Sequence, residues 1–140
     1  MAKVIDMQLM RYINLFERIS GVSTTDCFNY GNTLFFAIPK SKMNRALGPR
    51  GSNIKKLSDT LRRKIKLIEM PSSDEGIKKF IENLISPIEV TNIELKDGEL
   101  VISAPMQSRA MLIGRNRVRE DELKEILNKL FKIKSLKIGQ

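Results

Sequence analysis

Histidine and tryptophan are absent from this chain, and Cys27 is its only cysteine. The missing histidine removes the commonest general base and the commonest nitrogen ligand of metal ions. No pair of carboxylates stands out for acid–base catalysis, so we expect no enzyme, no metal site and no cofactor. A single cysteine allows neither an intrachain disulfide nor a zinc cluster, which favours a cytoplasmic protein.

Long apolar runs are missing as well. No stretch reaches the ~18 apolar residues of a membrane span, and the N-terminus lacks the apolar run of a signal peptide. We therefore expect no association with a membrane. The 140 residues, 41% hydrophobic and 29% charged, predict a globular protein of one ordinary domain or two small ones.

The whole chain has a net charge of +9, and its positive charge is concentrated in the first half. Residues 1–70 hold 13 basic and 5 acidic residues, whereas residues 71–140 hold 12 and 11. Residues 40–66 contain ten basic residues and a single acid, Asp59. A basic field focused in this way attracts a polyanion. Duplex DNA is disfavoured, because no recognition helix or dimer arrangement is visible.

A glycine-bracketed turn, Gly48-Pro49-Arg50-Gly51, lies within this basic segment. Its glycines allow backbone conformations that residues with a Cβ resist, and they let a phosphate approach the chain closely. The residues that follow begin a predicted helix, whose unpaired N–H groups suit a phosphate. The spacing does not match a Walker nucleotide-binding loop. The turn therefore predicts a site for the phosphates of a nucleic acid.

The apolar pattern predicts one order of elements that occurs twice: helix, strand, strand, short helix, glycine loop, helix, strand. In the first half we expect a helix over residues 4–19, strands over 24–30, 33–38 and 64–69, and a short helix over 42–47. In the second half we expect a helix capped by Asp74, strands over 88–95, 100–102 and 132–138, and a short helix over 107–113.

The register of this repeat supports a duplication. Pro39 precedes Gly48 by nine positions, Pro105 precedes Gly114 by nine, and the two pairs are offset by 66 residues. At the same offset Ile65 corresponds to Phe131. We predict two modules, over residues 1–70 and 74–140, joined by a linker at 71–73. The expected fold is mixed α/β (α+β), each module having a three-stranded sheet with helices on one face.

The chain resembles an archaeal NusA-like transcription factor, a stand-alone pair of type II KH modules. The resemblance covers nearly the whole chain and rests on the repeated element order, on Leu47-Gly48-Pro49-Arg50-Gly51-Ser52-Asn53-Ile54 and on Ile113-Gly114-Arg115-Asn116. It implies α-β-β-α-α-β topology in each module and binding of single-stranded RNA. It also implies a role in transcription termination, antitermination or pausing with RNA polymerase. We expect the chain to be a monomer.

The first module carries the stronger set of candidate RNA-binding residues. Gly48 and Gly51 let backbone amides approach a phosphate, Pro49 stiffens the turn, and Arg50 supplies a mobile charge. Cations that would line the path of the strand are Lys40, Lys42, Arg45, Lys55 and Lys56. Asn53 either contacts a phosphate or caps the helix. Bases are expected in an apolar groove near Ala46, Leu47 and Ile54.

The second loop, Gly114-Arg115-Asn116-Arg117, is a weaker candidate for RNA binding. Arg117 occupies the position of the closing glycine, where a left-handed arginine costs roughly 1–2 kcal/mol. Either this loop takes another shape or Arg117 is strained. Glu120-Asp121-Glu122 follow at once and repel phosphate, whereas the arginines of the loop could still contact phosphate through their side chains.

Two alternatives to the transcription hypothesis remain at this point. The chain could be a protein-docking module, a use favoured by the nearly neutral second half. It could also be a ribosome-associated or RNA-maturation KH protein, which would use the same phosphate-binding loop.

Overall fold

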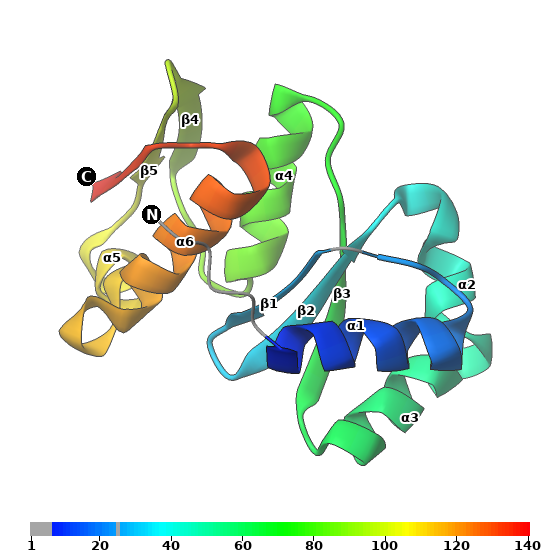
Figure 1. Cartoon of the computed structure of the whole chain (residues 1–140). Helices are drawn as coiled ribbons and strands as arrows, with labels where there is room; N and C mark the ends of the chain where they lie inside the picture. The colour runs from blue at the N-terminus through cyan, green and yellow to red at the C-terminus, as the bar shows by residue number, and fades with distance from the viewer. Residues whose placement is uncertain (1–6, 25) are drawn as a thin grey trace. The chain divides into compact units, whose positions relative to one another are not determined.

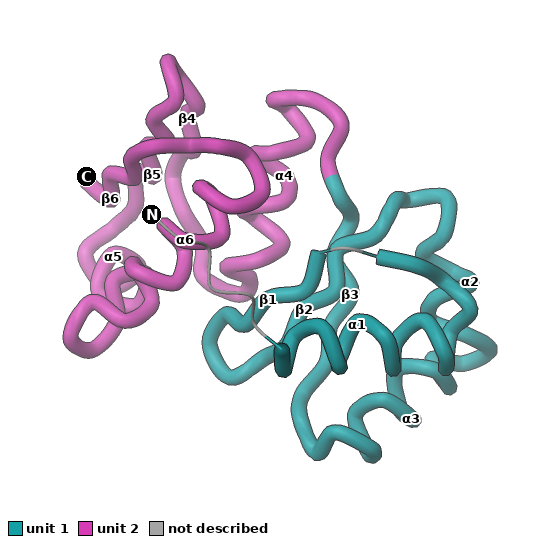
Figure 2. The backbone as a smooth tube through the Cα atoms, in the orientation of Figure 1, with its two compact units in different colours: residues 1–70 teal, residues 71–140 magenta. Residues whose placement is uncertain are grey.

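The computed structural model describes residues 7–24 and 26–140. The chain divides into two compact units, Met1–Met70 and Pro71–Gln140, called unit 1 and unit 2 (Figure 2). The first residues of the helix expected over 4–19, and Thr25 in the first expected strand, lie outside the described residues.

Unit 1 contains one three-stranded sheet with three α-helices (Figure 1). Strand β2 lies in the centre, antiparallel to β1 and parallel to β3. The elements are α1 (Met7–Ser20), β1 (Asp26–Tyr30), β2 (Thr33–Ile38), the 3₁₀ turn η1 (Lys40–Lys42), α2 (Met43–Leu47), the 3₁₀ turn η2 (Pro49–Gly51), α3 (Ser52–Leu61) and β3 (Lys64–Glu69).

The core of unit 1 forms where the helices meet one face of this sheet. Alternate residues of β2, Leu34, Phe36 and Ile38, are buried there, as the two-residue period of a strand requires. The ring of Phe16 from α1 stacks on Phe36 at a centroid distance of 4.5 Å. Leu57 of α3 completes the same buried cluster. This packing fixes the end of α2 and the start of α3, between which the glycine loop lies.

Unit 2 repeats this architecture. Strand β5 is central, antiparallel to β4 and parallel to β6. The elements are α4 (Asp74–Ile85), β4 (Asn92–Lys96), β5 (Glu99–Ser103), α5 (Met106–Ile113), the 3₁₀ turn η3 (Arg115–Arg117), α6 (Val118–Phe131) and β6 (Ser135–Gly139). The predicted fold class is confirmed: both units have the α-β-β-α-α-β topology of type II KH modules.

The offset of 66 residues holds from the first helix of each unit to the glycine loop and then changes. Helix α6 has 14 residues where α3 has 10. The last strands are offset by 71, because Leu34 pairs with Ile65 while Leu100 pairs with Leu136. The predicted correspondence of Ile65 with Phe131 is therefore wrong. Four extra residues add about one helical turn, which leaves the apolar face of α6 on the same side.

Several boundaries in unit 2 also differ from the prediction. The last strand spans residues 135–139 instead of 132–138. The first strand spans residues 92–96 instead of 88–95, and residues 88–91 follow a cis Ser86–Pro87 peptide bond as irregular chain. The cap of α4 is Ser73 and not Asp74, since the Ser73 Oγ accepts a hydrogen bond from the Gly76 N–H at 3.2 Å. Asp74 is the first residue of the helix itself.

No helix within the described residues is long and apolar enough to cross a bilayer.

Replacing Ser73 by alanine should destabilise unit 2, because one N–H group at the start of α4 loses its acceptor. We expect Ser73→Ala to lower the free energy of unfolding by about 1 kcal/mol in urea denaturation. Ser72→Ala, at an exposed neighbour, is the matched control and should unfold like the wild type. Equal midpoints for the two variants would contradict the assignment of Ser73 as the cap.

Candidate nucleic-acid interface

The loop between α2 and α3 depends on glycine at its first position. Gly48 has φ 76° and ψ 171°, a region that is essentially restricted to glycine. A Cβ at Gly48 would also lie 2.8 Å from atoms of the Asn53 and Ser52 side chains. Gly51 has φ 71° and ψ 21°, but a Cβ there would meet no atom within 4 Å. Conformation and space therefore both require glycine at position 48, whereas at position 51 conformation alone favours it.

An open groove of about 760 Å³ runs along this loop. It brings together several of the predicted site residues, including the half-buried Leu47 expected near the bases, with Asn44, which was not predicted as a contact of RNA. Its lining consists of Asn44, Arg45, Leu47, Gly48, Pro49, Arg50, Gly51 and Asn53. Lys40, Lys42, Lys55 and Lys56 are exposed but do not line the groove. Ala46, expected near the bases, is fully buried and cannot contact them.

Asn53 has a structural contact that the sequence did not reveal. Its Nδ2 donates a hydrogen bond to the carbonyl oxygen of Arg45 at 3.2 Å, which ties the start of α3 to the end of α2. The N-cap of α3 is Gly51, and no side chain caps the helix, so the expected capping role of Asn53 is wrong. The side chain instead holds the two ends of the loop together.

The Arg45 guanidinium extends toward the end of α1. Its Nη2 lies 3.5 Å from the place that a Cβ on Gly21 would occupy, just beyond the last residue of α1. A cation at the C-terminal end of a helix is favoured by the helix dipole. Arg45 therefore lies close to the end of α1 and also lines the groove.

The cations of unit 1 are available to an external anion. Lys40, Lys42, Arg45, Arg50, Lys55 and Lys56 are all exposed. Within residues 7–24 and 26–140, no ion pair involves a lysine or arginine of unit 1. Because no carboxylate neutralises them, these side chains retain their full attraction for a polyanion.

The second loop has the same backbone as the first. Gly114 has φ 76° and ψ 172°, Asn116 matches Arg50 at φ 56° and ψ 28°, and Arg117 has φ 61° and ψ 22°. Of the two predicted possibilities, the loop keeps its shape and Arg117 takes the left-handed conformation. The empty space beside Gly51 explains how this is possible, since a side chain at that position meets no obstacle.

The charges around the second loop are paired, unlike those of unit 1. Arg117 Nη1 lies 3.1 Å from Oε1 of the buried Glu120, and Arg119 pairs with Glu122. Both pairs have the i,i+3 spacing that brings side chains together on a helix, a signal that the sequence analysis did not use. Arg115 has no ion-pair partner among the described residues. The second loop thus keeps the backbone cradle, but its Arg117 and the nearby Arg119 of α6 are both paired with carboxylates.

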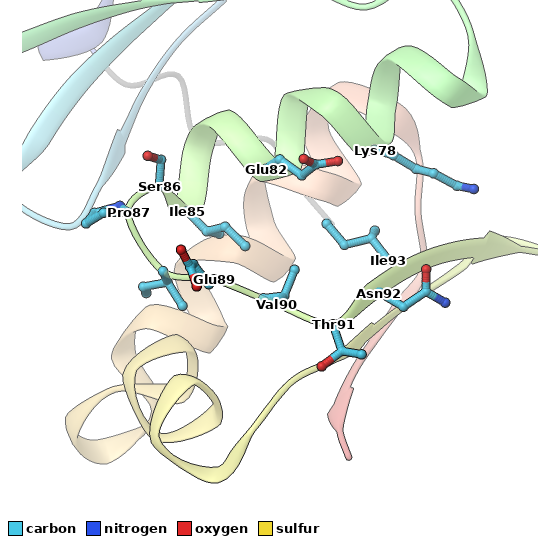
Figure 3. A pocket seen from close by; sticks show the side chains of 11 residues that line it. Lys78, Glu82, Ile85, Ser86, Pro87, Glu89, Val90, Thr91, Asn92 and Ile93 are labelled. Carbon is cyan, nitrogen blue, oxygen red and sulfur yellow. The ribbon is translucent and has the colours of Figure 1, made fainter.

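Another pocket, of about 690 Å³, lies in unit 2 and is lined by no residue of the second loop. Lys78 and Glu82 reach it from α4, and Thr91 and Asn92 reach it from the chain that enters β4 (Figure 3). It contains none of the predicted site residues. In the described part of the chain, no group of three or more Cys, Asp or Glu side chains is arranged to hold a metal ion.

Comparison with known proteins points to one kind of relative. No protein-family model matches the chain. Three curated relatives share the name "Probable transcription termination protein NusA". The protein of Methanococcus vannielii is 28% identical over 90% of this chain and 73% of its own length. That of Halococcus morrhuae is 24% identical over 93% and 94%, and that of Halobacterium salinarum is 23% identical over 90% and 91%.

Among solved structures, the crystal structure of APE1850 superposes with a TM-score of 0.63 at 27% sequence identity. The match covers 96% of this chain and 99% of that chain. The similarity therefore extends over both units.

The two glycines of the first loop should respond differently to alanine. Gly48→Ala should destabilise unit 1 by more than about 2 kcal/mol, because the backbone conformation and the contact with Asn53 are both violated. Gly51→Ala should cost about 1–2 kcal/mol, the price of a left-handed alanine without a clash. Chemical denaturation of the two variants checks this order, and a larger loss for Gly51→Ala would contradict the geometry.

Proposed function

This chain is an archaeal NusA-like protein, and we propose that it binds single-stranded RNA through loop 48–51 and acts with RNA polymerase in transcription termination, antitermination or pausing. The role is one of binding and not of catalysis, and it is exercised in the cytoplasm. The names of the curated relatives favour transcription over RNA maturation or ribosome association.

The observation that carries this proposal is an uncapped helix start beside a glycine loop. No side chain caps α3. The Ser52 N–H donates to the Pro49 carbonyl oxygen, so the N–H groups of the following residues in the first turn are the ones that remain available to an anion. Gly48 and Gly51 place no Cβ at either end of the loop, which lets a ligand approach the backbone closely there. A phosphate of the RNA backbone can then lie against the loop, where the positive end of the helix dipole stabilises its charge.

The exposed cations define the path of the strand on either side of this phosphate. Lys40, Lys42 and Arg45 lie before the loop, Arg50 lies on it, and Lys55 and Lys56 lie beyond it on α3. A KH module holds about four nucleotides in this way. With about four phosphates engaged, affinity should fall roughly 50-fold between 50 and 200 mM salt.

The second loop contributes less to RNA binding in this proposal. Gly114, Arg115, Asn116 and Arg117 reproduce the backbone of the first loop. However, Arg117 is paired with Glu120, and an incoming phosphate would have to displace that carboxylate. Repulsion by Glu120, Asp121 and Glu122 opposes the exchange.

A carboxylate placed at the same position of each loop tests which loop holds RNA. Arg50 and Asn116 are both left-handed and exposed, and aspartate tolerates this conformation, so both variants should fold. We expect Arg50→Asp to weaken binding of a short fluorescent single-stranded RNA at least tenfold. Asn116→Asp should change the affinity less than threefold.

Fluorescence anisotropy at two salt concentrations provides the measurement, with circular dichroism as a check on folding. Wild-type binding that does not depend on salt would overturn the phosphate-binding role of loop 48–51. An equal loss in both variants would instead assign the two loops the same role.

A further inference from the structure

The groove of unit 1 contains a neutral amide that the phosphate-binding role does not use. Asn44 lines the groove from α2, and its side chain is exposed. Within residues 7–24 and 26–140, no hydrogen bond engages this side chain. A phosphate oxygen can use only the donor of an amide, whereas the edge of a base can use its donor and its acceptor together. Asn44 therefore has the chemistry of a residue that reads a base.

Leu47 gives a base an apolar surface beside this amide. Asn44 and Leu47 are three residues apart on α2, a spacing that places two side chains on the same face of a helix. Leu47 is half-buried and also lines the groove. The bases of single-stranded RNA are unpaired, so both their faces and their edges are open to a protein. A base that lies on Leu47 is placed to present its edge to Asn44.

Hydrogen-bond acceptors are otherwise scarce in the groove. Its two arginine side chains, Arg45 and Arg50, are donors only. Asn53 is half-buried, and its Nδ2 is bound to the Arg45 carbonyl oxygen. Four backbone carbonyl oxygens of the groove already accept a hydrogen bond, those of Asn44, Arg45, Gly48 and Pro49. Either arginine can bind a carbonyl oxygen of a base, but an exocyclic amine finds its exposed side-chain acceptor in Asn44 Oδ1.

Unit 2 lacks this amide. At the offset of 66, Ala110 takes the place of Asn44, although Ile113 keeps an apolar side chain at the position of Leu47. The amide of the second loop, Asn116, stands in the place of Arg50 on the loop itself. The pairing of an apolar side chain with an amide three residues before it is therefore found in α2 and not in α5.

The cations around the second loop are moved as well as lost. Methionines 106 and 111 replace Lys40 and Arg45, while three arginines are gained in the places of Pro49, Gly51 and Asn53. Two of these, Arg117 and Arg119, are paired with glutamates. Arginine supplies donors only, so the gain of three arginines does not restore the acceptor that Asn44 provides in unit 1.

We propose that Asn44 selects the base beside loop 48–51 and that it favours adenine and cytosine. Both bases carry an exocyclic amine next to a ring nitrogen that accepts a hydrogen bond, so the amide can bind them through its oxygen and its NH₂ group at once. Guanine and uracil present a carbonyl oxygen at that position, which the arginines of the groove can bind without Asn44. This inference rests on the proposed function, to which it adds the preferred bases and the residue that reads them.

Short RNAs with a single base separate this preference from the attraction of the phosphates. Each RNA carries one central base, adenine, cytosine, guanine or uracil, with abasic riboses elsewhere, and a fully abasic RNA measures the backbone alone. All have the same phosphates, so the ratio of two affinities cancels the phosphate contribution. We expect the full-length wild type to bind the adenine and cytosine RNAs roughly fivefold or more tightly than the guanine and uracil RNAs in fluorescence anisotropy.

Substitutions of Asn44 separate its acceptor from its donor. Asn44→Ala should reduce the preference to less than about twofold, because both groups are lost. Asn44→Asp keeps the acceptor and should retain the preference, although its charge weakens the binding of every RNA. Asn44→Lys has donors only and should abolish the preference. Asn14→Ala, at an exposed asparagine of α1 that does not line the groove, is the matched control and should show the wild-type preference.

The outcomes distinguish the inference from the proposed function. A wild-type preference for adenine alone or for cytosine alone supports the inference and names the base. Equal affinities for the four bases, a preference for guanine and uracil, or a preference that persists in Asn44→Ala would overturn it. Salt-dependent binding of the fully abasic RNA would in those cases leave the phosphate-binding role of loop 48–51 intact. Failure of the wild type to bind any of the five RNAs would overturn the proposed RNA binding itself.

Discussion

The backbone at Gly48 determines how the cations before the loop are placed relative to those on α3. With φ 76° and ψ 171°, it turns the chain from the end of α2 into the start of α3. The hydrogen bond from Asn53 to the Arg45 carbonyl then holds the two helices at this turn. As a result, the uncapped start of α3 faces the groove along the loop, and cations from both helices flank it. A side chain at Gly48 would displace Asn53 and disturb this arrangement.

The two units show that one backbone can support two kinds of surface. Gly114 repeats the conformation of Gly48 to within 1° in ψ, and α6 begins as α3 does. What differs is the set of side chains around the loop: unpaired cations in unit 1, and methionines with arginine–glutamate pairs in unit 2. Fold alone therefore does not assign the same function to both units, and their side chains decide it.

The sequence predicted local features well and tertiary contacts poorly. The strands at 33–38 and 64–69 were predicted with their observed bounds. A short apolar run after the Gly31-Asn32 turn marks the first, and alternating apolar residues mark the second. The longer α6 shifted the last strand, since a full added turn leaves the apolar pattern of a helix unchanged. The hydrogen bond of Asn53 to Arg45, and the nearness of the Arg45 side chain to Gly21, could not be predicted from spacing because they join separate elements. The pair of Arg117 and Glu120 could have been predicted, since its spacing is i,i+3.

The central claim is that RNA phosphate binds at the loop of unit 1 and not at the equivalent loop of unit 2. Titration of ¹⁵N-labelled protein with a short single-stranded RNA, followed by NMR, tests it residue by residue. The account predicts that the amide signals of residues 48–53 shift progressively, while those of residues 114–119 stay within the range of the rest of the chain. Shifts centred on residues 114–119, or shifts of equal size at both loops, would contradict it.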